Sequence, residues 1–107
     1  MLFLAGQTGT DATGKIINPF DLVEQFTHTL ANLKTVIEAA GGTMTDIVKL
    51  TIFVTDKIAY RAQLGRIGEA YRAFFGYYYP AMTLVEVKSL FDRNAMVEIE
   101  GIAVLYT

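Results

Sequence analysis

The fold is decided by the last stretch of the chain, Ala95-Met-Val-Glu-Ile-Glu-Gly-Ile-Ala-Val-Leu105. Its side chains alternate in character with the period of a β-strand, in which successive residues point to opposite faces. One face is apolar throughout, whereas the other places Glu98 and Glu100 among aliphatic neighbours. Two carboxylates on such a face indicate either the rim of a pocket or half of an interface.

The composition describes a single, unusually apolar domain. At 107 residues the chain can form one hydrophobic core but has no room for a second, so we expect one domain over residues 1–107. Apolar residues make up 52% of the chain and the mean hydropathy is +0.34. No apolar run approaches the roughly 20 residues needed to span a bilayer, so we expect no membrane partner. The excess of apolar residues is better explained by surface that is buried in an oligomer.

Charge and residue usage argue against several classes of protein. The net charge of −2 and the pI near 5.2 give no basic patch for nucleic acid. The chain has no cysteine, which excludes disulfides and thiol chemistry, and its first residues lack the basic lead-in of a signal peptide. We therefore expect a cytoplasmic protein. The single histidine, His28, argues against a histidine metal site or a Ser-His triad, and we expect it to be an exposed helix residue.

Periodicity and turn residues predict two helices among five strands. The first helix is expected to start at Asn18-Pro19 and to end at Gly41-Gly42. The second is expected to start after Thr55-Asp56 and to end at Gly76, and its Gly65 and Gly68 suggest close packing against the first helix. Alternating residues predict the strands at 2–7, 15–17, 47–54, 81–88 and 95–105.

This order, β-β-α-β-α-β-β, predicts an α+β fold with both helices on one face of a mixed sheet. Each of the three long strands has one apolar face that we expect to meet the helices, Val48 included. No further element of the chain is left to cover the opposite faces, so we expect another subunit to cover them. These faces are predicted to hold Lys49, Thr51, Phe53, Met82, Leu84, Glu86, Glu98, Glu100, Ile102 and Val104.

Seven segments distributed over essentially the whole chain resemble the RidA/YjgF/L-PSP family, the reactive-intermediate deaminases, some members of which were first described as endoribonucleases or translation inhibitors. No single motif is decisive, but the segments follow one another in the family's order. They are Leu4-Ala-Gly-Gln7, Asn32-Leu-Lys34, Ile37-Glu-Ala-Ala-Gly41, Val48-Lys-Leu-Thr-Ile-Phe-Val-Thr-Asp56, Tyr71-Arg-Ala-Phe-Phe75, Pro80 and Val97-Glu-Ile-Glu-Gly-Ile-Ala-Val104.

The resemblance implies a chorismate-mutase-like subunit that assembles as a homotrimer with three clefts between subunits. It implies hydrolysis of enamines and imines released by pyridoxal-phosphate enzymes, without any cofactor or metal of the protein's own. In the family the first Glu of the closing strand helps to place the attacking water, and here that residue is Glu98. An Arg after Pro-Ala holds the substrate carboxylate, but Pro80-Ala81 is followed by Met82 in this chain.

A thioether cannot make the bidentate, charge-assisted contact that a guanidinium makes with a carboxylate. Two further family positions also differ, because the Ser or Thr before Gly-Gln is Ala5 and the Asn of the second helix aligns with Gly68. The Tyr that closes the pocket in the family has no counterpart, because this chain begins at the strand that follows it. We expect either that the numbered chain lacks a native N-terminal extension or that this branch does without one.

The candidate site therefore consists of Glu98 with a substrate-binding set of Gly6, Met82, Thr83 and Leu84. Glu98 either activates water or is a structural carboxylate, and Glu100 is better explained as a structural residue. Met82 is either an apolar pocket floor or an interface contact. Main-chain amides near Gly6 and Thr83 would polarise the substrate.

Aromatic and basic residues near this set are secondary candidates. One of Tyr77, Tyr78 and Tyr79 is expected to line the cleft, while interface packing is expected for the other two. Arg93 is a possible source of the missing positive charge, although a loop arginine is usually solvated.

The leading functional hypothesis is a small-molecule hydrolase of this family, with a substrate that is neutral or differently charged from the usual 2-imino acid. The alternative is a trimer that binds a small ligand or a partner without catalysis. An RNA-cleaving member is the weakest of the three, because the chain is acidic and lacks a basic patch.

Overall fold

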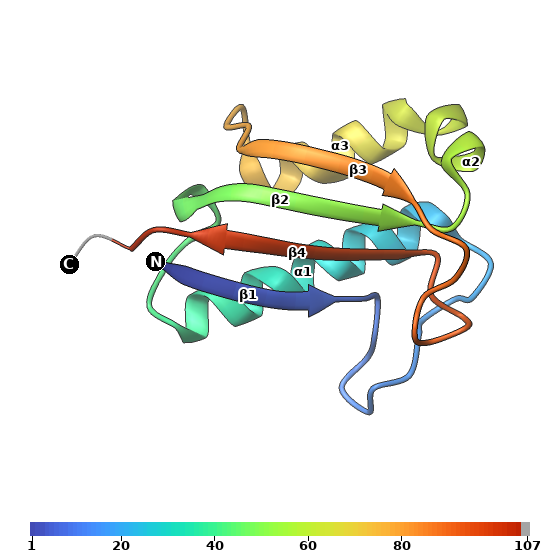
Figure 1. Ribbon diagram of the computed structural model, residues 1–107, viewed down its shortest axis with the longest axis horizontal. Helices are drawn as coiled ribbons and strands as arrows, with labels where there is room; N and C mark the ends of the chain where they lie inside the picture. Colours follow the sequence, from blue (N-terminus) through green and yellow to red (C-terminus); the bar gives the residue numbers. More distant parts are fainter. Residues whose placement is uncertain (106–107) are drawn as a thin grey trace.

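A computed structural model describes residues 1–105 as a four-stranded sheet with its helices on one face (Figure 1). The strand order is β1-β4-β2-β3, in which β2 and β3 run parallel and the other pairs run antiparallel. The α+β class, the mixed sheet and the one-sided helices are as predicted. The elements are β1 (Leu2–Gln7), α1 (Leu22–Ala39), η1 (Met44–Asp46), β2 (Ile47–Val54), α2 (Lys57–Ala62), α3 (Leu64–Phe75), β3 (Ala81–Glu86) and β4 (Val97–Ala103).

The closing strand β4 lies in the interior of the sheet and alternates as predicted. Val97, Ile99 and Ala103 are fully buried against the helices, whereas Glu98 is half-buried and Glu100 is exposed on the other face. The core that receives the apolar face comes mainly from α1, whose buried side chains follow the helical period. They include Phe26, Leu30, Leu33 and Ile37.

Several element boundaries differ from the predictions, and the strands expected at 81–88 and 95–105 are shorter, spanning Ala81–Glu86 and Val97–Ala103. The cap of α1 is Asp21, whose carboxylate accepts a hydrogen bond from the Glu24 amide at 3.0 Å, whereas Asn18 lies in the preceding turn with φ of 27°. The short strand expected at 15–17 is reduced to one bridge between Thr10 and Ile16. The second helix starts after Asp56 as predicted but is interrupted at 63, which separates α2 from α3.

The glycines of α3 do not pack against α1 as expected. Gly65 is exposed, and a Cβ added there would meet nothing within 4 Å. A Cβ on Gly68 would meet only the side chain of Arg72. The buried side chains of α3 are instead the larger ones, Ile67, Tyr71 and Phe75.

A bulge in β2 overturns the predicted placement of Val48. The pairing with β4 slips between Ile47 and Lys49, so Ile47 is fully buried while Val48 is 42% exposed. One extra residue in a strand reverses the direction of the side chains beyond it, which simple alternation cannot anticipate.

The two faces of β3 are the reverse of those predicted. Residues opposite each other in a ladder share a face, and Met82 pairs with the buried Leu50 while Leu84 pairs with the buried Ile52. Met82 and Leu84 therefore face the helices. Thr83 lies on the open face, where its hydroxyl accepts a hydrogen bond from Lys49 Nζ at 2.6 Å.

Glu86 also belongs to the helix side of β3, because its carboxylate accepts a hydrogen bond from the Lys57 amide at 2.9 Å, in the first turn of α2. On the open face, nothing among the described residues covers the sheet. The apolar side chains on that face include Phe3, Phe53, Val85 and Ile102.

Candidate functional site

Glu98 and Gly6 lie together at a bulge between β1 and β4. Leu4 pairs with Gly101 and Gln7 pairs with Ile99, so three steps along β1 match two along β4. The Glu98 carboxylate lies against Gly6 so closely that a Cβ at position 6 would collide with its Oε2. Bulges often re-aim side chains beside active sites, and here the missing side chain at Gly6 makes room for the acid. Two of the predicted site residues are therefore neighbours.

The Glu98 carboxylate is half-buried and forms no hydrogen bond or ion pair within residues 1–105. It shares the open face with Phe53, its partner on β2. Within the described residues no backbone amide and no lysine of the same chain holds this acid.

The segment that follows Gly6 is held against α1 by Asn32. Its side-chain amide donates hydrogen bonds to the carbonyls of Thr8 and Thr10, both at 2.9 Å. These bonds fix where β1 ends, and therefore where the main chain of Gly6 lies relative to Glu98.

Gln25 is a buried polar residue that the sequence analysis did not single out. Its amide nitrogen donates to the carbonyls of Asn18 and Asn94 at 3.0 and 3.2 Å, and its oxygen accepts from the Met96 amide at 2.8 Å. This residue joins the start of α1 to the segment that leads into β4. The available signal was a polar residue three positions after Leu22, within the apolar stripe of the helix.

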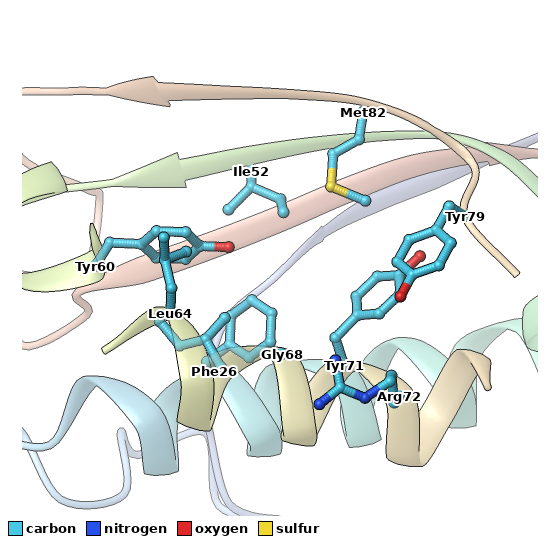
Figure 2. Close-up of a pocket in the computed structure, with 10 residues that line it drawn as sticks. Phe26, Ile52, Tyr60, Leu64, Gly68, Tyr71, Arg72, Tyr79 and Met82 are labelled. Carbon is cyan, nitrogen blue, oxygen red and sulfur yellow. The ribbon is translucent and has the colours of Figure 1, made fainter. Parts of the chain in front are cut away.

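A cavity of about 160 Å³ lies between α3 and β3 (Figure 2). Figure 2 shows Met82 reaching down from β3 toward Tyr71, Leu64 and Phe26, with Tyr79 beside Tyr71. The Tyr71 and Tyr79 rings stack at 5.3 Å with 9° between their planes. Most of the lining is apolar or aromatic, which suits the side group of an organic ligand.

Tyr71 is a hydrogen-bond donor and not a base in this cavity. Its hydroxyl donates to the carbonyl of Tyr78 at 3.0 Å. Burial, with smaller contributions from the neighbouring Tyr79 and Tyr78, raises the pKa of Tyr71 to about 12. The phenol therefore stays protonated at neutral pH and supports the wall of the cavity.

The other three predicted site residues do not lie together in the structure. Met82 lines the cavity, Leu84 packs on the core, and Thr83 lies on the open face. Because β2 separates β3 from β4, Met82 and Glu98 lie on different strands and opposite faces of the same sheet. One chain alone does not bring them together.

Of the three consecutive tyrosines, Tyr79 lines the cavity. Tyr77 is 90% exposed. The Tyr78 hydroxyl donates to the carbonyl of Ile47 in its own chain.

Two further basic candidates lie elsewhere. Arg93 lines a separate cavity of about 270 Å³ with Lys88 and Phe20, so within one chain it does not provide a charge beside Met82. His28 on α1 is half-buried, whereas the sequence suggested an exposed position. Within residues 1–105 no three His, Asp or Glu side chains gather as metal ligands would. Nor does that part of the chain hold a helix of the length and apolarity required to cross a membrane.

Comparison with known proteins decides the family. The family model described as Endoribonuclease L-PSP matches residues 1–105, essentially the whole chain. The chain belongs to this family. The L-PSP relatives include the putative reactive intermediate deaminase TdcF of Escherichia coli, 36% identical over 97% of this chain and 78% of that protein. They also include the 2-iminobutanoate/2-iminopropanoate deaminase of mouse, 32% identical over 96% of this chain and 73% of that protein.

Solved L-PSP-type structures share the fold. The Rid family protein YyfB of Yersinia pestis superposes with a TM-score of 0.86 at 32% identity, covering 97% of this chain and 77% of that one. E. coli TdcF with bound serine superposes with a TM-score of 0.81 at 34% identity, covering 97% and 80%. The four-stranded α+β architecture of this chain is therefore that of its family.

Proposed function

We propose that this chain hydrolyses reactive imines or enamines at a site that a second copy of the chain completes. The observation that carries the proposal is the Glu98 carboxylate, which lies over Gly6 at a strand bulge and has no other partner within residues 1–105. Deaminases of reactive intermediates and of 2-imino acids among the relatives support the same chemistry.

In the proposed reaction Glu98 positions a water molecule and takes one proton from it as the oxygen attacks the imine carbon. The new C–O bond gives a carbinolamine as the C=N double bond becomes single and the nitrogen gains a proton. Cleavage of the C–N bond then releases ammonia and leaves a carbonyl product. Water and imine are consumed and carbonyl compound and ammonia are formed, so no cofactor takes part.

The assembly we propose is a homotrimer in which the open sheet faces turn inward. Phe3 is 72% exposed and Val85 is 37% exposed on that face, which is unusual surface for an isolated domain. A neighbouring chain is also needed chemically, because Met82 and Glu98 of one chain lie on opposite faces of its sheet. Each cleft would then combine the α3–β3 cavity of one chain with Glu98 of the next.

Met82 supports a substrate with a bulkier and more apolar side group than 2-iminobutanoate. Together with Leu64 and Ile52 it gives this part of the cavity a hydrophobic lining, at the position where the family resemblance led us to expect an arginine. The same feature favours the second candidate function, in which a trimer binds an apolar ligand without catalysis.

The test is hydrolysis of imines generated in situ by an amino-acid oxidase and followed by trapping with semicarbazide. We expect the leucine-derived imine to be hydrolysed faster than 2-iminobutanoate. Glu98→Gln should lower the rate about 100-fold or more, as expected for loss of a general base. Glu100→Gln is the matched control and should keep the wild-type rate. If the wild-type protein does not accelerate the hydrolysis of any imine, the proposal is contradicted, and ligand binding without catalysis becomes the better account.

A gain of function tests the role of Met82. Met82→Arg adds a guanidinium on β3, at the position expected from the family resemblance, so hydrolysis of 2-iminobutanoate should rise about tenfold. An unchanged rate in this variant, with Glu98 intact, would show that Met82 does not determine the substrate.

A further inference from the structure

We infer that Arg72 binds the carboxylate of the substrate, so that this chain takes anionic 2-imino acids with a branched or aromatic side group. The inference rests on the proposed function and revises the expectation of a neutral or differently charged substrate. Arg72 lies on α3 and lines the same cavity as Met82. The positive charge that the strand lacks is therefore present on the helix that faces it.

The Arg72 side chain lies back along α3 toward Gly68 (Figure 2). Its Nη1 is 3.2 Å from the position that a Cβ on Gly68 would occupy. A side chain at position 68 would thus compete with the guanidinium for the same space. The atom in contact is the far end of a flexible side chain, so an alanine at position 68 would displace the guanidinium by a few tenths of an ångström.

The charge of Arg72 is available to a ligand. No hydrogen bond or ion pair within residues 1–105 engages its guanidinium. Glu69, one turn earlier on α3, is exposed, and the Glu86 carboxylate at the far end of β3 accepts the Lys57 amide. Neither of them lines the cavity.

Chemistry at the cavity then defines the ligand. Arg72 is exposed, so its guanidinium at the mouth of the cavity can bind a planar carboxylate with two parallel hydrogen bonds. The apolar and aromatic lining formed by Met82, Leu64 and Tyr71 receives the ligand's hydrocarbon part. A carboxylate with a bulky apolar group can contact both the guanidinium and the apolar lining, whereas a small imino acid would contact the guanidinium alone.

Binding of a matched ligand pair tests the inference without any catalysis. We would titrate the oligomeric protein with phenylacetate and with its neutral analogue phenylacetamide by isothermal calorimetry. The wild-type protein should bind the carboxylate at least about tenfold more tightly than the amide. Arg72→Gln should remove that preference, while Arg66→Gln, an exposed arginine of α3 outside the cavity, should retain it.

The alternative outcomes separate the inference from the proposed function. The role of Arg72 would be overturned if the wild-type protein did not prefer the carboxylate. It would also be overturned if Arg72→Gln kept that preference, and neither result depends on whether the protein hydrolyses imines. An Arg72-dependent preference in a protein that hydrolyses no imine would support the inference and contradict the hydrolase. In an active enzyme, Arg72→Gln should raise KM at least about tenfold with a smaller change in kcat.

Discussion

At the scale of single residues, the site depends on small side chains that leave room for charged ones. Gly6 admits the Glu98 carboxylate, and Gly68 admits the Arg72 guanidinium. The first pair joins two neighbouring strands, whereas the second joins residues four apart on one helix. From the sequence Glu98, Gly6 and Met82 could be nominated through the family resemblance, whereas Arg72 was not singled out.

The buried amide of Gln25 should be costly to replace. Gln25→Met removes three hydrogen bonds and leaves the Met96 amide without its partner, so we expect the free energy of unfolding to fall by about 2–3 kcal/mol. Urea denaturation measures this change. The control Gln63→Met loses one 3.3 Å bond to the Ala59 carbonyl and should change the unfolding free energy by no more than about 0.5 kcal/mol. Equal effects of the two substitutions would contradict the role given to Gln25.

Tyr71 should make the stability of the protein fall at alkaline pH. Its pKa is raised to about 12 in the folded chain, whereas the unfolded phenol has the ordinary value of 10.0. The unfolded state therefore loses its proton first, and the contribution of Tyr71 is fully present below pH 10 and declines toward pH 12. The stability difference between the wild-type protein and Tyr71→Phe, measured by urea denaturation, should shrink over that range. A difference independent of pH would contradict the shift.

At the scale of elements, the sequence predicted the buried face correctly where only one face of a helix or strand is apolar. The alternation of β4 and the stripe of α1 gave the core correctly. The strand β3 is apolar on both faces, with Met82 and Leu84 on one and Val85 on the other, so alternation could not decide which face meets the helices. Its register with β2 decides this, and register is a tertiary property. The bulges at Gly6 and Val48 escaped prediction for the same reason.

The two glycines of α3 should respond differently to alanine. Gly65→Ala places its Cβ in open space and should raise the free energy of unfolding by about 0.5–1 kcal/mol. Gly68→Ala gains the same helix propensity but crowds Arg72, so it should stabilise the helix less and weaken phenylacetate binding. Thermal denaturation and calorimetry provide the two readouts. Stronger carboxylate binding by Gly68→Ala would show that the glycine is not there to admit the arginine.

At the scale of the whole molecule, the open sheet face and the divided site lead to the same expectation. The proposed homotrimer would bury the apolar face and would bring the α3–β3 cavity of one chain to Glu98 of another. Phe3→Glu puts a charge on that face, so sedimentation should show three-chain particles for the wild-type protein and monomers for the variant. A wild-type monomer at micromolar concentration would contradict the assembly.

The most direct test of a shared site is complementation between two inactive variants. Glu98→Gln lacks the proposed base, and Met82→Glu places an acid in the apolar cavity. When the two are unfolded together and refolded as mixed trimers, random assembly should restore about one quarter of the wild-type rate, because about one cleft in four then combines an intact Glu98 with an intact Met82. Each variant refolded alone should stay inactive. No recovery in the mixture, from trimers shown to be mixed, would contradict a site built from two chains.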